Sequence, residues 1–333
     1  PISERVRALL VCAVHRFITS ARPSAFAGTP PSGSSPVAAV HNAAVDDDPH
    51  KRSMPFLPRS EDDASHVNGA PIGVFDSGVG GLSVLRHIHE MLPREDLIYL
   101  ADAAYAPYGG RSGDEITARA RVVCGWLVEQ GAKAVVVACN TATVVAVASL
   151  RAEFDIPIVA MEPAIKPAAL MTRSGAVGVL ATERTLASEQ FQDLVQRYAN
   201  GVRIVAQPCP GLVELVERGH LDPARTMPLL SRYLQPLLDE HIDVLVLGCT
   251  HYPFLLPTIS HMTGSGVTII DPAVAVTQQL RRRLASDAGM APHSGAGVLR
   301  FFTSGVPDVV GPVIELLWQA PVQLRQVLAP HHA

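Results

Sequence analysis

Two short segments of this chain are nearly alike, and each leads into a cysteine. The apolar runs 134–138 and 244–248 precede Cys139 and Cys249. In an open α/β sheet, ligands bind beyond the carboxyl ends of the strands, so a thiol placed there faces a ligand. Two such thiols predict one site flanked by two sulfur atoms, which can take a proton from one face of a carbon atom and return it to the other. Polar residues follow both thiols: Asn140, Thr141, Thr250 and His251.

A single cysteine is ordinarily an inert, small apolar residue of the core. Cys124, on a predicted helix, is expected to be one. The polar residues after Cys139 and Cys249 would be wasted in a core, which favours a chemical role for these two thiols. His251 stands two positions after Cys249 and can hydrogen-bond a thiolate there, stabilising its charge.

Two loops near the same sheet edge add further candidates. The first is a glycine-rich turn, Asp-Ser-Gly-Val-Gly-Gly at 76–81, which opens a predicted helix. Its free N–H groups favour an anion, but its spacing matches neither a dinucleotide fingerprint nor a P-loop, so a carboxylate is the expected ligand. Asp76 can orient a thiol or serve as a helix N-cap, and the motif leaves both open. The second loop, 102–111, supplies two tyrosines and backbone donors.

Composition bounds the class of protein. The chain has 333 residues, of which 48% are hydrophobic and 17% charged, enough for two globular domains. A net charge of -4 gives no reason to expect nucleic acid or an anionic membrane as a partner. No apolar run approaches the ~18 residues of a transmembrane helix. Five cysteines without paired spacing indicate a reducing compartment, so the cytoplasm is the expected location.

Residues 1–69 differ from the rest and are expected to form a disordered extension, because they are rich in Pro, Ser and Asp and lack periodicity. The alternative is a targeting signal, since arginines precede the apolar run 8–14, although that run is short. Met54 lies just before the globular part and is a candidate start of translation.

Beyond residue 70 the pattern alternates between predicted strands and helices. Short apolar runs bounded by Gly and Pro are typical of a parallel sheet buried on both faces. The predicted strands are 72–76, 97–101, 134–139, 156–161, 177–181, 202–206, 244–249, 267–271 and 298–302. The predicted helices include 82–92, 114–130, 183–198 and 223–241, the last with Asp222 as N-cap. The expected fold is α/β, with two similar open parallel sheets flanked by helices and the active site in the cleft between them.

From residue 71 to about 330 the chain resembles the glutamate racemases, cofactor-independent enzymes of the aspartate/glutamate racemase superfamily. The most specific stretch is Gly-Cys-Thr-His-Tyr-Pro at 248–253. The other matching stretches, in family order, are Gly-Val-Phe-Asp-Ser-Gly-Val-Gly-Gly at 73–81, Pro-Tyr-Gly at 107–109, Ala-Cys-Asn-Thr at 138–141 and Gly-Val-Leu-Ala-Thr at 178–182.

The resemblance implies interconversion of L- and D-glutamate, without cofactor or metal, to supply D-glutamate for peptidoglycan synthesis. It implies that Cys139 takes the proton from D-glutamate and Cys249 from L-glutamate, with Asp76 assisting the first and His251 the second. It also implies a homodimer. The substrate-binding positions that it implies are Asp76, Ser77, Tyr108, Gly109, Asn140, Thr141, Thr250 and His251.

A further glutamate of the family stands in a Cys-Pro-x-x-x-x-Leu-x-Glu stretch, which aligns Glu217 as a catalytic residue. Glu214 departs from the family pattern, since many members have Pro there. Glu183 and Arg184 also stand where small or apolar residues are expected. The resemblance further places the first domain at 70–163 plus 277–333 and the second at 164–276.

Three alternatives stay open. The nearest is a related racemase for aspartate or a hydantoin. The second is a zinc protein with Cys139, Cys249, His251 and Asp76 as mixed ligands, although structural zinc sites usually bring closely spaced cysteine pairs. The third is an amino-acid-binding regulator that has lost catalysis, against which both thiols and His251 argue.

Overall fold

The computed structural model describes residues 69–292 and 294–329. The extension expected over 1–69 lies, apart from Gly69, outside the described residues. Among those that are described, no helix combines the length and apolarity needed to span a membrane.

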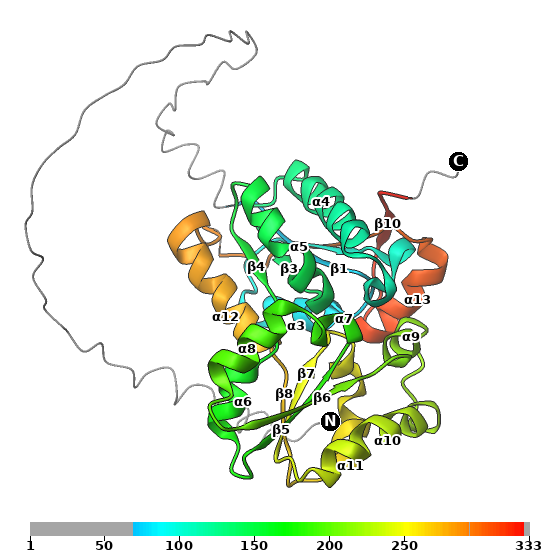
Figure 1. The fold of residues 1–333 in the computed structure, drawn as a ribbon. Helices are drawn as coiled ribbons and strands as arrows, with labels where there is room; N and C mark the ends of the chain where they lie inside the picture. The colour runs from blue at the N-terminus through cyan, green and yellow to red at the C-terminus, as the bar shows by residue number, and fades with distance from the viewer. Residues whose placement is uncertain (1–68, 293, 330–333) are drawn as a thin grey trace, which may run out of the picture. The chain divides into compact units, whose positions relative to one another are not determined.

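Two fully parallel sheets form the frame (Figure 1), which confirms the expected α/β fold. The first has the strand order β10-β9-β2-β1-β3-β4 and the second β6-β5-β7-β8. The strands of the first sheet are β1 (Ile72–Asp76), β2 (Leu97–Ala101), β3 (Ala134–Val137), β4 (Ile158–Ala160), β9 (Leu299–Thr303) and β10 (Leu324–Gln326). Those of the second are β5 (Ala176–Ala181), β6 (Arg203–Pro208), β7 (Val244–Gly248) and β8 (Thr268–Ile270).

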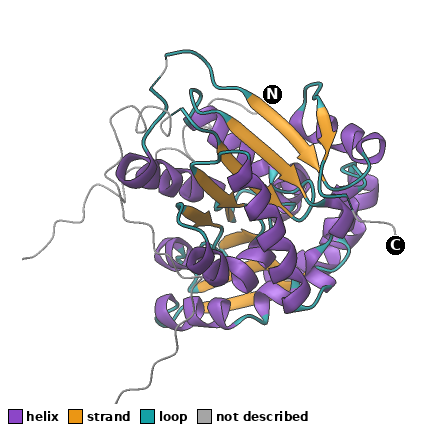
Figure 2. Cartoon of the chain, turned by 90° about the horizontal axis from the view of Figure 1, so that it is seen from above, coloured by secondary structure: helices purple, strands orange, loops and turns teal. Residues whose placement is uncertain are grey.

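Helices cover both faces of each sheet, as Figure 2 shows. On the first sheet, Phe75 and Leu100 pack with α4 (Gly113–Glu129) and α5 (Asn140–Glu153). The opposite face packs with α3 (Leu82–Met91), α12 (Ala273–Arg283) and α13 (Pro307–Trp318). The second sheet lies between α6 (Ile165–Met171) and α8 (Glu189–Tyr198) on one face and α9 (Leu212–Glu217), α10 (Pro223–Asp239) and α11 (Leu256–Thr263) on the other.

The strand order determines where a ligand can bind. In the first sheet, β1 pairs with β2 on one side and β3 on the other, so the connections leave the sheet in opposite directions. In the second sheet, β5 stands in the same way between β6 and β7. Such a reversal opens a crevice at the carboxyl ends of the strands. Cys139 and Cys249 follow β3 and β7, so each thiol lies beside one reversal.

The predicted strands and helices are present, most with limits one or two residues from those predicted, and three differences bear on the argument. The helix predicted over 183–198 is two helices, α7 (Glu183–Leu186) and α8, because Thr182 and Ser188 each cap a separate start. Strand β3 ends at Val137, so Cys139 is the N-cap of α5 rather than the last strand residue. Strand β10 was not predicted, since three largely polar residues at a sheet edge carry little signal.

Candidate active site

Residues from both sheets line one cavity of about 190 Å³. Its volume would hold only a few water molecules at ~30 Å³ each, so it fits a small metabolite. The first sheet contributes Ser77, Pro107, Tyr108, Gly109, Gly110, Cys139, Asn140 and Thr141. The second contributes Thr182, Glu183, Cys209, Pro210, Gly211, Val213, Glu214, Cys249, Thr250 and His251.

Cys139 lies on the side of the first sheet, with 5% of its surface exposed. Its Sγ accepts a hydrogen bond from Ala142 N at 3.4 Å and donates one to Ser77 Oγ at 3.6 Å. Burial raises the pKa of the Cys139 thiol above its ordinary value, and the nearby carboxylate of Asp76 raises it further. Both effects favour the protonated thiol of Cys139.

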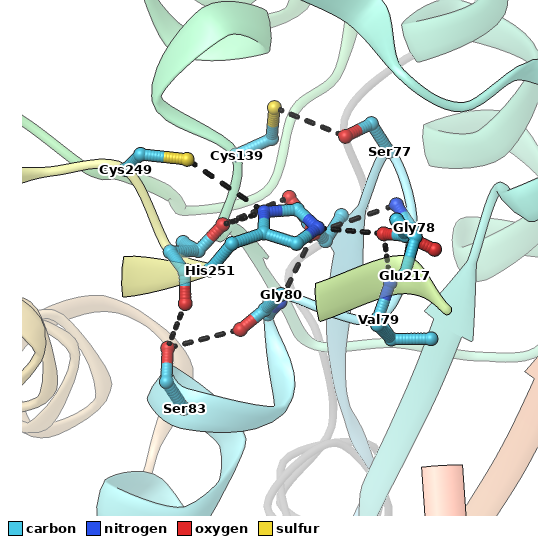
Figure 3. A network of polar contacts seen from close by, with 12 residues as sticks. Ser77, Gly78, Val79, Gly80, Ser83, Cys139, Glu217, Cys249 and His251 are labelled. Atoms are coloured by element: carbon cyan, nitrogen blue, oxygen red, sulfur yellow. Dashed lines mark hydrogen bonds and ion pairs between the residues drawn. The ribbon is translucent and has the colours of Figure 1, made fainter. Parts of the chain in front are cut away.

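Cys249 lies on the side of the second sheet, and its Sγ is 3.6 Å from His251 Nδ1. The other ring nitrogen, Nε2, is 2.6 Å from Glu217 Oε1 (Figure 3). Burial opposes protonation of His251, but hydrogen bonds to Cys249 and Glu217 and their negative charges raise its pKa well above the ordinary value. The imidazolium that results stabilises a thiolate on Cys249.

Two backbone N–H groups of the glycine-rich turn bind carboxylates of the protein itself. Gly81 N donates to Asp76 Oδ2 at 3.0 Å, and Val79 N donates to Glu217 Oε1 at 2.8 Å. These two N–H groups are therefore engaged within the fold, whereas Ser77 of the same turn lines the cavity. The glycines are needed because a Cβ at Gly78 would collide with Glu217 and one at Gly80 with His251. The turn thus supports the His251–Glu217 pair from below, as Figure 3 shows.

Asn140 is the strongest sign of a polar ligand. Its side chain is 2% exposed and lines the cavity, yet neither its Nδ2 nor its Oδ1 has a hydrogen-bond partner. A buried amide without partners costs free energy that a bound ligand can recover. Beside it, Thr141 Oγ1 lies 3.1 Å from Thr182 Oγ1, which joins the two halves of the cavity wall.

The structure brings together most of the residues that the sequence singled out. Asp76 and Glu217 are exceptions, since neither lines the cavity. Asp76 is fully buried behind Cys139 and Thr250, whose Oγ1 is 3.5 Å from Asp76 Oδ1. Burial raises the pKa of Asp76, and the positive charge of His251 acts against this. Glu217 lies behind His251 and contacts its Nε2.

Several lining residues were not predicted as part of the site. Thr182 ends a matching stretch, and Cys209 stands in the motif that aligns Glu217, so both carried a signal. Glu183 and Glu214 had been noted only as departures from the family pattern, and both line the cavity. Within 69–292 and 294–329, no three His, Cys, Asp or Glu side chains are arranged to hold a metal ion.

Two buried thiols line one cavity from the two sheets, which is the arrangement that an enzyme moving a proton between two bases requires. A family model described as Asp/Glu/Hydantoin racemase matches residues 72–280. The chain belongs to this family.

Within the family, the similar proteins include several glutamate racemases. The chain is 51% identical to the glutamate racemase of Stutzerimonas stutzeri over 250 residues, which are 75% of this chain and 94% of that protein. Two solved structures each have a TM-score of 0.69 and cover 78% of this chain. That of Francisella tularensis, in complex with D-glutamate, is 29% identical over 97% of its own chain. That of Escherichia coli, in complex with L-glutamate and the activator UDP-MurNAc-Ala, is 33% identical over 98%.

Proposed function

We propose that this protein is a glutamate racemase that interconverts L- and D-glutamate by proton transfer at the α-carbon and supplies D-glutamate for peptidoglycan synthesis. Relatives about half identical over most of the chain are glutamate racemases. Related structures were solved with each of the two enantiomers. The observation that carries the proposal is the pair of thiols, Cys139 and Cys249, that line one small cavity from two sheets.

The two thiols have unlike surroundings, which suits opposite protonation states. Cys139 is held as a thiol by burial and by Asp76. Cys249 Sγ lies 3.6 Å from His251 Nδ1, where an imidazolium can stabilise the thiolate that begins the cycle. In this state the Cys249 thiolate removes the α-proton of L-glutamate, and the Cys139 thiol delivers a proton to the opposite face. After the transfer the protonation states are exchanged, and the enzyme is ready for D-glutamate.

The developing carbanion needs stabilisation, because it forms beside a carboxylate. Among the described residues, the cavity lining includes no Lys or Arg, so neutral donors must bind the substrate's carboxylates. The unpartnered amide of Asn140 and the backbone N–H groups at the start of α5 are aimed at one such group. Hydrogen bonds of this kind strengthen in a closed cavity as negative charge grows on the oxygens.

The remaining lining residues bind and orient the substrate. We assign this role to Ser77, Tyr108, Gly109, Thr141 and Thr250. The charge of Asp76 raises the pKa of Cys139 and so favours the protonated thiol that delivers a proton, and Glu217 keeps His251 protonated and correctly oriented. Of the group, Ser77 is in direct contact with a thiol, at 3.6 Å from Cys139 Sγ.

The distribution of strands supports the domain boundaries 70–163 plus 277–333 and 164–276. Strands β1 to β4, β9 and β10 build one sheet, and β5 to β8 build the other. The substrate then binds between two domains, and their separation would admit it. We expect the protein to be cytoplasmic. We also expect a homodimer, which sedimentation of the purified protein would test.

The proposal is tested by circular dichroism of L- and D-glutamate incubated separately with the purified protein, without added pyridoxal phosphate. Both solutions should decay to zero ellipticity. L- and D-aspartate and a hydantoin, run in parallel, should keep their signals. A flat trace with both enantiomers of glutamate, from protein whose fold is intact by far-ultraviolet spectra, would refute the proposal.

A further inference from the structure

The loop between β2 and α4 forms one wall of the substrate cavity but has little structure of its own. Pro107, Tyr108, Gly109 and Gly110 line the cavity. Only two short 3-10 turns, Ala103–Tyr105 and Tyr108–Gly110, occur within the loop. Backbone of this kind keeps a fixed position only if side chains from neighbouring elements hold it.

Asp102 is the fixed point of the loop. It directly follows β2, is fully buried, and its N–H donates to Asp76 O at 3.0 Å. Its carboxylate accepts a hydrogen bond of 2.6 Å from Tyr108 Oη. The Tyr108 hydroxyl is therefore engaged away from the substrate, so Tyr108 and Gly109 act on the substrate through the ring and the backbone.

Arg119, on α4, completes this arrangement. Its Nε and Nη2 donate to the two oxygens of Asp102 at 3.1 and 2.7 Å, a two-bond geometry that fixes the plane of the carboxylate. Its guanidinium also lies 3.7 Å from the centre of the Tyr105 ring. Arg119 thus holds the loop at two points, directly at Tyr105 and through Asp102 at Tyr108.

Charge gives Arg119 a second task. Asp102 is a fully buried carboxylate next to a cavity whose proposed substrate carries two carboxylates. Arg119, whose side chain is 15% exposed, forms an ion pair with Asp102. Without it, a buried negative charge would face an anionic ligand across Tyr108.

We propose that Arg119, which does not line the cavity, is a positioning residue that sets the place of the Tyr108–Gly109 segment and thereby the affinity for the substrate. The inference rests on the proposed function for the identity of that substrate. A planar guanidinium is required, since an ammonium cannot make the two parallel bonds and stack on Tyr105 at once.

The test compares Arg119→Gln and Arg119→Lys with Arg121→Gln. Arg121 lies on the same helix but pairs at the surface with Glu153, so it controls for loss of one positive charge. The readouts are the Kd of D-glutamate by calorimetry, KM and kcat, and the melting temperature. Arg119→Gln should raise Kd and KM for both enantiomers by about ten- to a hundredfold, with a smaller change in kcat, because binding is lost in ground and transition states alike. Arg119→Lys should fall between it and the wild type, and Arg121→Gln should match the wild type.

Amide hydrogen exchange of a peptide covering 105–111 should be faster in Arg119→Gln than in Arg121→Gln. A Kd and KM within twofold of wild type, or unchanged exchange in this loop, would overturn the inference. If Arg119→Gln does not fold, Tyr108→Phe is the second variant, because it removes the hydrogen bond from Tyr108 Oη to the Asp102 carboxylate. It should raise the Kd of D-glutamate about fivefold. An unchanged Kd overturns the inference. Wild-type protein that binds glutamate without racemising it overturns only the proposed function, and protein that binds no glutamate overturns both.

Discussion

Glu217 offers a way to change the charge of His251 without altering the cavity wall. Glu217 Oε1 is 2.6 Å from His251 Nε2 and also accepts from Val79 N at 2.8 Å. Replacement by Gln keeps the size of the side chain and one hydrogen bond, but removes the negative charge. Since burial opposes protonation of His251 and the charges of Cys249 and Glu217 favour it, the pKa of His251 falls in Glu217→Gln.

The size of the effect follows from the bond that is weakened. A hydrogen bond to a charged group contributes ~1.5–3 kcal/mol and a neutral one ~1 kcal/mol, so the variant loses about 0.5–2 kcal/mol at His251. If that loss falls on the transition state, kcat/KM decreases about two- to thirtyfold. The sign of the pH dependence is also determined. His251 acts while protonated and loses this state as pH rises through its raised pKa, so the alkaline decline of kcat/KM must begin at lower pH in the variant.

The assay is racemisation followed by circular dichroism in both directions over a series of pH values. Because the equilibrium constant between enantiomers is one, the profiles in the two directions must coincide, which checks the data internally. Glu240→Gln is the control, since this surface carboxylate lies outside the site and pairs with the exposed Arg203. A Glu217→Gln profile that overlays the wild type in both height and alkaline limb would refute the role given to this pair.

Three further predictions follow from the structure. Cys139→Ser and Cys249→Ser should each reduce racemisation by at least ~100-fold with far-ultraviolet spectra unchanged, because serine is too weak an acid to exchange the proton; more than a tenth of the activity remaining would remove that thiol from the mechanism. His251→Asn should enlarge the primary isotope effect with α-deuterated L-glutamate more than with the D-enantiomer, and equal effects would contradict the division of labour. Lys133 Nζ lies 2.7 Å from the buried Glu95, and Lys133→Met removes this ion pair. Calorimetry should show a melting temperature lower by about 10 °C, because a buried charge without its partner destabilises the fold. An unchanged melting temperature would show that the ion pair does not stabilise the protein.

Local signals were sufficient for most of the sheets. Strands β1 and β2 have the predicted limits, because continuous apolar runs end at Asp76 and Asp102, where buried backbone gives way to polar turns. The same pattern singled out the two cysteines that line the cavity, since a thiol just after a buried strand, followed by polar residues, has few structural explanations. Asp222 caps α10 as predicted, with Oδ1 3.1 Å from Arg225 N.

Contacts between distant parts of the chain were beyond local reasoning. Glu217 and Val79 are 138 positions apart, and only the fold shows that a carboxylate from α9 fills the glycine-rich turn that was expected to bind a ligand. Arg119 gave no signal at all, because an arginine on an amphipathic helix ordinarily faces solvent. Its role is visible only once α4 lies beside the loop and Asp102 is seen to be buried.

The most direct test of two-thiol proton transfer is a single turnover of L-glutamate in deuterium oxide, with enzyme in excess over substrate. The D-glutamate formed should carry deuterium at the α-carbon, because its new hydrogen comes from the solvent-exchanged thiol of Cys139. D-glutamate that retains the original α-hydrogen would show that one base, rather than two, moves the proton, and would contradict the mechanism even if the protein proved to be a racemase.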